Sequence, residues 1–180
     1  MKYYQRLDCF QKKQNHSFLA NLRAVLWYLT ARQLVSSIIP GHFWRKKLLQ
    51  LFGAQFGHGG NLKPRITIAC PWNLFIGDHC WIGENVWIDN LADVKVGDHV
   101  CISQGVYICT GNHDYRRISF DVFLRPVSIE SQAWVCARAT IAPGSCIRFG
   151  AVVSLGAVVN GEVPPGAIVH GNPSHSFKFR

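Results

Sequence analysis

The sequence has no uncharged apolar run long enough to cross a membrane. Its most apolar segment, Phe18 to Ile39, is interrupted by Arg23 and Arg32. The uncharged stretch between these arginines is far shorter than the ~20 residues that a spanning helix needs. No small-x-small cleavage site follows a suitable apolar run, so we do not expect a secretory signal peptide either.

The cysteine and glycine motifs of several enzyme classes are also missing. The chain has seven cysteines, and none of them forms a CxxC pair or a zinc-type spacing. It has no P-loop, no GxGxxG after a strand and no nucleophile elbow, which argues against P-loop NTPases, dinucleotide-binding enzymes and α/β-hydrolases. We expect a reduced, cytoplasmic protein, and we expect no nucleic-acid partner.

Acidic residues are almost absent from the first third of the chain. Residues 1–65 contain eleven Lys or Arg and one acid, Asp8, whereas the remainder contains eight basic and nine acidic residues. The net charge of +9 therefore comes from this basic segment. One helical face of the segment is apolar and carries Phe18, Leu22, Val25, Leu26 and Leu29.

A second helix is predicted from about His42 to Phe52, with Gly53 as its stop and with Arg45, Lys46 and Lys47 pointing outward. Two interpretations of residues 1–65 follow. The helices cap the open end of a solenoid with their apolar face, or they make a peripheral, mainly electrostatic contact with an anionic membrane. Both can hold, although capping and membrane insertion would compete for the same apolar face.

A ruler of β-branched residues runs through the rest of the chain. Most steps are six residues, two are eight and one is twenty-one, and the ruler residues are Ile68, Ile76, Ile82, Ile88, Val96, Ile102, Ile108, Ile129, Val135, Ile141, Ile147, Val153 and Val159. A six-residue period of this kind is typical of a parallel β-helix, in which three short sides make one triangular coil. The sequence thus predicts an all-β, parallel β-helix of hexapeptide repeats over residues 66–170, followed by a tail at 171–180.

Grouping the ruler by threes tests this prediction against its irregular steps. Both eight-residue steps and the long step then follow the first side of their coils, so all three insertions leave the prism at one corner. A sandwich of short strands does not predict that coincidence.

The long insertion, residues 109–128, is the main candidate for chemistry. It carries His113, and a histidine on a loop held by a rigid scaffold can take a proton from an attacking hydroxyl. The alternative is an ordinary surface histidine. Coil stacking places Cys109 over Asp89 and His113 above Asp93, so either aspartate could meet a sugar hydroxyl or steady the histidine. For Asp93 a hydrated corner carboxylate is the preferred interpretation.

Two further histidines, His79 and His99, each lie three residues past a ruler residue and should stack one coil apart. They raise the alternative of a metal-dependent β-helix hydratase of the carbonic anhydrase type. That enzyme binds zinc through three histidines, and no third histidine has the required spacing here. We therefore expect no metal and interpret both residues as solvent-facing corners.

Several local motifs together resemble one family. They are Leu51-Phe52-Gly53-Ala54, Pro71-Trp72-Asn73-Leu74, Ile102-Ser103-Gln104, Cys109-Thr110-Gly111-Asn112-His113-Asp114-Tyr115, Ala133-Trp134, Val163-Pro164-Pro165 and Gly171-Asn172-Pro173. From about residue 48 to the end, the chain resembles the hexapeptide-repeat acyltransferases. Within them it is most similar to the colanic acid biosynthesis acetyltransferases and the galactoside and maltose O-acetyltransferases.

The resemblance implies a left-handed β-helix, a homotrimer, and acetyl-CoA as co-substrate in a groove between adjacent prisms. It implies O-acetylation of a sugar hydroxyl in exopolysaccharide or lipid-linked glycan biosynthesis, with His113 as general base. On the acceptor side it implies Asp89, with Asp114 beside the base and Trp134 as a wall. The backbone N–H of Ala137 matches a donor near the thioester, and the positions matching CoA contacts are Leu155, Asn160, Gly161, His175 and Lys178.

Some positions depart from the family pattern. Pro173-Ser174-His175 replaces the usual Pro-Ala-Lys or Pro-Ala-Arg, and Gly161 stands where a basic residue is common. These departures weaken the match at the positions that contact the CoA tail more than the match at the general base. A non-catalytic trimeric β-helix subunit remains a further alternative, against which the retained His113 argues.

Overall fold

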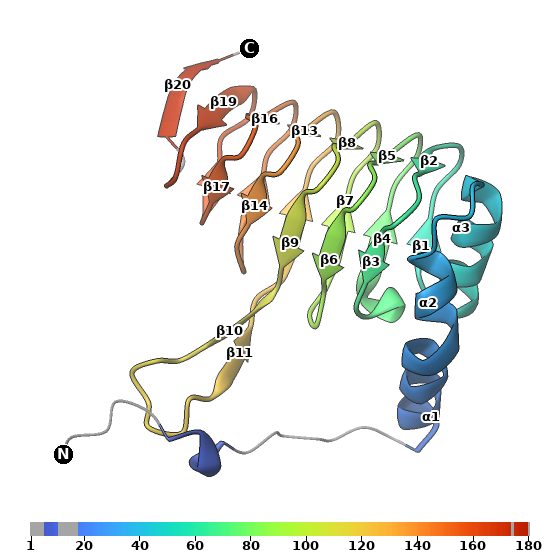
Figure 1. The fold of residues 1–180 in the computed structure, drawn as a ribbon. Helices are drawn as coiled ribbons and strands as arrows, with labels where there is room; N and C mark the ends of the chain where they lie inside the picture. Colours follow the sequence, from blue (N-terminus) through green and yellow to red (C-terminus); the bar gives the residue numbers. More distant parts are fainter. Residues whose placement is uncertain (1–5, 11–17, 174, 180) are drawn as a thin grey trace.

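The computed structural model describes residues 6–10, 18–173 and 175–179. Three parallel sheets form the sides of a prism (Figure 1). The first sheet contains β1 (Gln55–Phe56), β4 (Leu74–Ile76), β7 (Val94–Val96), β12 (Val127–Ile129), β15 (Cys146–Ile147) and β18 (Glu162–Val163). The third contains β3 (Thr67–Ile68), β6 (Trp87–Asp89), β9 (Tyr107–Cys109), β14 (Thr140–Ile141) and β17 (Val158–Val159).

The second sheet is the longest and includes the C-terminal strand. It contains β2 (Asn61–Leu62), β5 (Trp81–Ile82), β8 (Cys101–Ile102), β13 (Trp134–Val135), β16 (Val152–Val153), β19 (Ala167–His170) and β20 (His175–Phe179). All neighbours in the three sheets pair in parallel except β19 and β20, which pair antiparallel. The predicted parallel β-helix is therefore confirmed.

The ruler residues build the core as predicted. Each stacks on the ruler residue of the next coil, as Ile68 does on Ile88 and Ile88 on Ile108, and each is buried. All three insertions leave the prism between the third and first sheets. The solenoid also extends beyond the ruler: β1 and β2 form a coil before residue 66, in which Leu62 supplies the inward side chain.

Helices cover the first coil of the prism. They are α1 (Phe18–Leu26), a π-helical turn η2 (Trp27–Ala31), α2 (Arg32–Val35) and α3 (His42–Leu51). Trp27, Ala31, Val35 and Leu49 are buried in one cluster with the solenoid core. The indole N–H of Trp27 donates to the carbonyl of Ile68 at 3.3 Å. The end of α3 agrees with the prediction, since Gly53 follows it with a φ of 100°.

The predicted packing face of the first helix is wrong. The five residues of that face lie on the outside of the protein, each with 46–80% of its surface exposed. They are Phe18, Leu22, Val25, Leu26 and Leu29. The physical reason is that the helix is apolar on two sides. The side with Trp27, Ala31 and Val35 offers one large indole and a small residue that lets the helix approach the coil closely, and that side packs inward.

The predicted outward orientation of Arg45 is also wrong, since this side chain is fully buried. Its guanidinium donates to the carbonyls of Val35, Gly41, Ser37 and Ile39. The last carbonyls of a helix have no partner within it, and a buried charge needs such acceptors. Arg45 therefore closes the end of α2 and the connection to α3.

Two short 3₁₀ turns complete the description of the helical elements. A single 3₁₀ turn, η1 (Leu7–Cys9), precedes the helices, and the backbone N–H of Arg6 donates to the carbonyl of Ile118 in the long insertion. A second 3₁₀ turn, η3 (Pro71–Asn73), fills the first eight-residue step. None of the described helices has the length and apolarity that crossing a membrane requires.

Candidate functional site

The long insertion is a two-stranded hairpin on the prism corner. After β9 the chain runs out as β10 (Gly111–His113) and returns as β11 (Val122–Leu124), which pair antiparallel with His113 opposite Val122. Buried Thr110 fastens its base: its backbone N–H and its hydroxyl both donate to the carbonyl of Asp89, at 3.1 Å each. The hairpin is thus anchored in the middle of the third sheet, where β9 pairs with β6 and β14.

The ring of His113 is held in one orientation within this hairpin. Its Nδ1 lies 2.7 Å from the carbonyl oxygen of Phe120. The Phe120 ring stacks on the imidazole with centroids 4.2 Å apart and planes 9° apart. Phe10 lies 5.8 Å from the same ring, at a tilt. Because a carbonyl can only accept, Nδ1 carries the proton of the neutral ring, and Nε2 keeps its lone pair.

His113 lines a pocket of about 520 Å³ at the outer end of the hairpin. Asp114 lies beside it, and its carboxylate accepts from the N–H of Arg116 and pairs with Arg117 at 3.5 Å. The carboxylate of Asp121 pairs with Arg117 as well, at 3.1 Å. The remaining lining residues are Asn112, Tyr115, Val122, Phe123 and Arg125. The pocket is thus rich in arginine.

Asp89 lies under Cys109, as coil stacking predicts. The phenol of Tyr107 donates to its Oδ2 at 3.3 Å. Burial and the neighbouring Cys109 and Asp89 raise the pKa of Tyr107, so the phenol stays protonated and remains a donor. Asp89 is half-buried on the third sheet and is not part of the lining of the His113 pocket.

The other predicted site residues lie on other parts of the prism. Trp134 is exposed on the second sheet, and its indole N–H donates to the Ser103 hydroxyl at 3.0 Å. Ala137 and Leu155 stack at the corner between the second and third sheets. Asn160 and Gly161 lie one side further on, after β17. Trp134, Ala137 and Leu155 therefore lie away from the corner that carries the hairpin, whereas Asn160 and Gly161 lie on that corner two coils further along.

Two predicted positions fall partly outside the described structure. His175 and Lys178 belong to β20, opposite His170 and Ile168 of β19. Their side chains lie outside the described residues.

His79 and His99 stack as predicted, with ring centroids 5.2 Å apart and planes 21° apart. Both residues adopt a positive φ, near 55°, which is typical of a tight corner. Within the described ranges, no group of three His, Cys, Asp or Glu could hold a metal ion. The hydratase alternative therefore gains no support from the geometry.

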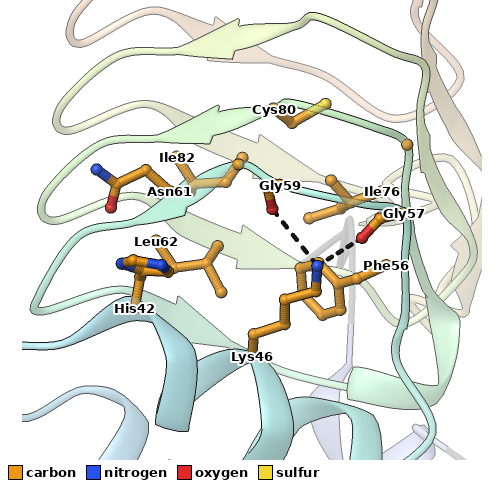
Figure 2. A pocket seen from close by; sticks show the side chains of 12 residues that line it. His42, Lys46, Phe56, Gly57, Gly59, Asn61, Leu62, Ile76, Cys80 and Ile82 are labelled. Atoms are coloured by element: carbon orange, nitrogen blue, oxygen red, sulfur yellow. Dashed lines mark hydrogen bonds between the residues drawn. The ribbon is translucent and has the colours of Figure 1, made fainter.

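A second cavity lies between α3 and the first coil, and Figure 2 shows its lining. It encloses only about 10 Å³, which is space for one water molecule at most. The ammonium of Lys46 reaches into it and donates to the carbonyls of Gly57 and Gly59. The predicted outward orientation of Lys46 is therefore wrong, because its side chain points toward the coil. The cavity is too small for a ligand and is part of the packing between α3 and the first coil.

The hairpin contacts are what sequence reasoning missed. Neither the carbonyl of Phe120 nor the ring of Phe10 carries a recognisable signal, because both act through the fold of an irregular segment. The aromatic content of the insertion was the only hint.

Comparisons with known proteins concern the family and the fold. No protein-family model matches the chain. It is 36% identical over 137 residues to a protein of Escherichia coli described as a "putative colanic acid biosynthesis acetyltransferase", covering 76% of this chain and 75% of the relative. It is 24% identical over 132 residues to the galactoside O-acetyltransferase of Escherichia coli, covering 72% of this chain and 65% of that enzyme.

Among solved structures, a hexapeptide-repeat acetyltransferase of Vibrio cholerae complexed with acetyl-CoA superimposes with a TM-score of 0.80. Its sequence identity is 25%, and the match covers 94% of this chain and 93% of the other.

Proposed function

The chain belongs to the hexapeptide-repeat acetyltransferases, and from that premise we propose that it moves the acetyl group of acetyl-CoA to a sugar hydroxyl. The acceptor would be an intermediate of exopolysaccharide or lipid-linked glycan assembly, and the protein would act in the cytoplasm. One observation carries this proposal: His113 lines a pocket on a scaffold-held hairpin, and its Nδ1 is engaged by the Phe120 carbonyl, which leaves the lone pair on Nε2. The kinship with a colanic acid acetyltransferase supports a sugar as the acceptor.

The reaction follows from the held tautomer. Nε2 of His113 takes the proton of the sugar hydroxyl as its oxygen attacks the thioester carbonyl carbon, and the imidazolium is stabilised by Nδ1–H donating to the Phe120 carbonyl. The new C–O bond forms, the C–S bond breaks, and the CoA thiolate leaves and recovers the proton. The backbone N–H of Ala137 would stabilise the oxyanion between these steps. No cofactor besides acetyl-CoA is needed.

The acceptor side has two features that suit a phosphate-bearing glycan carrier. Arg116 and Arg125 line the pocket with their guanidinium groups over the rings of Tyr115 and Phe123, at 5.5 and 5.2 Å. Guanidinium groups in this setting bind phosphate oxygens well. Asp89, ordered by Tyr107, would accept a hydrogen bond from a sugar hydroxyl.

We propose that the complete site forms between two chains of a homotrimer. His113 and Asp114 extend from one corner of the prism, whereas Trp134, Ala137 and Leu155 lie on the second sheet or at its far edge. On that side the described surface carries exposed apolar residues that a neighbour could cover: Trp81 (63%), Trp134 (43%) and Leu155 (72%). The hairpin of one chain would then meet the CoA-binding side of the next. Asn160, Gly161, His175 and Lys178 would contribute further CoA contacts.

A mass-spectrometric screen of nucleotide-linked and lipid-linked sugars, incubated with the protein and acetyl-CoA, tests the acceptor class. A mass gain of one acetyl group with release of free CoA is expected for at least one glycan. If only water accepts the acetyl group across the panel, the proposed acceptor class is wrong.

A pair of aspartates refines that test. Asp89→Asn should raise the KM for the sugar about tenfold or more and leave the KM for acetyl-CoA unchanged, since a charged hydrogen bond is worth about 1.5–3 kcal/mol. Asp93→Asn is the matched control, because Asp93 lies on the same corner and its carboxylate makes only a 3.9 Å ion pair with Lys95. Equal effects of the two substitutions would remove Asp89 from the acceptor site.

A further inference from the structure

The helix from Phe18 to Val35 has apolar residues on two opposite sides. The inner side, Trp27, Ala31 and Val35, is buried against the first coil. The outer side exposes 80% of Phe18, 73% of Leu29 and about half of Leu22, Val25 and Leu26. Figure 1 places α1 and α2 at the end of the prism, beyond β1, β2 and β3. The solenoid therefore needs only one of the two apolar sides.

Helix α3 also exposes an apolar side, opposite its buried residues Arg45 and Leu49. Phe43 and Leu51 are exposed to 68% and 79%, and Lys47 lies between them on the same side of the helix with its ammonium 5.7 Å from the Phe43 ring. We call these residues together the outer cap face: Phe18, Leu22, Val25, Leu26, Leu29, Phe43, Lys47 and Leu51. A helix that is apolar all round is normally covered on all sides, and an apolar patch left on a surface usually marks a contact site.

The charge around the outer cap face identifies the partner. Residues 18–65 contain seven Lys or Arg and no Asp or Glu. Of these cations, Lys47 belongs to the outer cap face, and Arg23, Lys63 and Arg65 are exposed elsewhere on the helices and the first coil. A second copy of the same face would bring two cationic surfaces together without a compensating acid. An anionic lipid surface offers both the apolar interior and the negative charge that this end of the molecule presents to it.

We propose that the outer cap face inserts into the headgroup region of an anionic membrane, with α1 and α3 lying in the plane of the surface. This goes beyond a purely electrostatic contact, because the capping of the first coil uses the opposite side of the helix and leaves these side chains free to insert. It rests in one respect on the proposed function: in a threefold trimer of parallel prisms, three such faces would point to one side and bind together. Acetyl transfer itself does not depend on it.

Vesicle flotation with the full chain tests the proposal. The probes are vesicles of phosphatidylcholine alone and of phosphatidylcholine with phosphatidylglycerol, each at low and high salt. The protein should float with the anionic vesicles, and more weakly at high salt. At high salt it should still bind these vesicles more strongly than a Phe18→Ser/Leu29→Ser variant does. Phe18→Ser combined with Leu29→Ser should weaken binding to anionic vesicles by about tenfold or more, since two exposed apolar anchors are lost.

The matched control is Phe149→Ser, the same change at an exposed phenylalanine several coils away. Vesicle binding of this variant should equal that of the wild type. Melting temperatures of all three proteins should agree, because none of the substituted side chains is buried, and sedimentation should show the same assembly.

Three outcomes would overturn the inference. They are equal flotation with neutral and anionic vesicles, unchanged flotation of the Phe18→Ser/Leu29→Ser protein, and a change of that protein's assembly without vesicle binding by the wild type. The last result would make the outer cap face a contact between chains. Since the flotation assay needs no turnover, its failure is distinct from a failure of acetyl transfer.

Discussion

The stability of the helical cap should depend on one buried arginine. The Arg45 guanidinium donates to the carbonyls of Val35 at 3.1 Å, Gly41 at 2.7 Å and Ser37 at 2.8 Å, and also to that of Ile39. Burial lowers the pKa of Arg45, yet the group stays charged at any ordinary pH. Among the described residues, its charge is therefore balanced by these carbonyl dipoles, with no ion pair to an acid.

Arg45→Met keeps much of the side-chain volume and removes all four donated hydrogen bonds. A hydrogen bond involving a charged group contributes about 1.5–3 kcal/mol, and a carbonyl left unpaired in the interior costs about 1–3 kcal/mol. Three of the four bonds are only partly buried, so water can replace part of what is lost. We expect a net loss of about 3–4 kcal/mol in the free energy of unfolding, a decrease in melting temperature of roughly 6–16 °C.

Calorimetry and denaturant titration measure this change. Lys47→Met, an exposed cation two residues along the same helix, is the control and should change the free energy of unfolding by less than about 0.5 kcal/mol. The loss in the free energy of unfolding for Arg45→Lys should lie between those of the two methionine variants, because an ammonium cannot reach four divergent carbonyls. If Arg45→Met melts together with Lys47→Met, the assignment of Arg45 as the closure of α2 is wrong.

Three other expectations concern charge, backbone and metal. Bonds from Arg148 lower the pKa of Glu130 and of Glu162, so their contribution to stability is present above the unfolded pKa and is lost as pH falls through the folded one. The melting temperature of Arg148→Gln should therefore fall less than that of the wild type below about pH 4.5. Gly60→Ala places a Cβ 2.6 Å from a carbonyl of the next coil at a φ of +82°, whereas Gly156→Ala meets nothing within 4 Å at a φ of +65°. Denaturant titration should show that Gly60→Ala lowers the free energy of unfolding by about 2–4 kcal/mol and that Gly156→Ala lowers it by about 1 kcal/mol. EDTA should leave the rate of acetyl transfer unchanged, and a loss of activity that zinc restores would favour the metal-dependent alternative.

The prism could be predicted from sequence because its determinants repeat. A single β-branched residue every six positions sets each side, and register between coils then follows by counting, which is why Cys109 lies over Asp89 and His79 stacks on His99. The irregular steps added information, because counting three ruler residues per coil placed all three insertions at the same corner of the prism.

The cap could not be predicted in the same way. Periodicity shows that a helix has an apolar side, but a helix with two such sides leaves the choice to packing. Here the choice depends on the fit of Trp27, with its bond to the Ile68 carbonyl, and on the π-helical turn that starts at this residue. The burial of Arg45 could not be predicted for a similar reason. Its acceptors are backbone carbonyls, and every residue type has one.

The site was predictable only in part. A histidine on the long insertion was predicted as the candidate base and lines the pocket there, whereas the Phe120 carbonyl that orders its ring belongs to an irregular turn. The separation of His113 from Trp134, Ala137 and Leu155 also requires three-dimensional information, because neighbours in a triangular coil can face opposite directions.

The most direct test of the central claim is the rate of acetyl transfer by His113→Ala at saturating acetyl-CoA and acceptor. We predict a decrease of kcat by about 10²–10⁴-fold, with the affinity for CoA and the melting temperature unchanged. His79→Ala, at an exposed histidine away from the hairpin, should retain the wild-type rate. A His113→Ala protein that keeps more than about a third of the wild-type kcat would contradict the assignment of His113 as the general base.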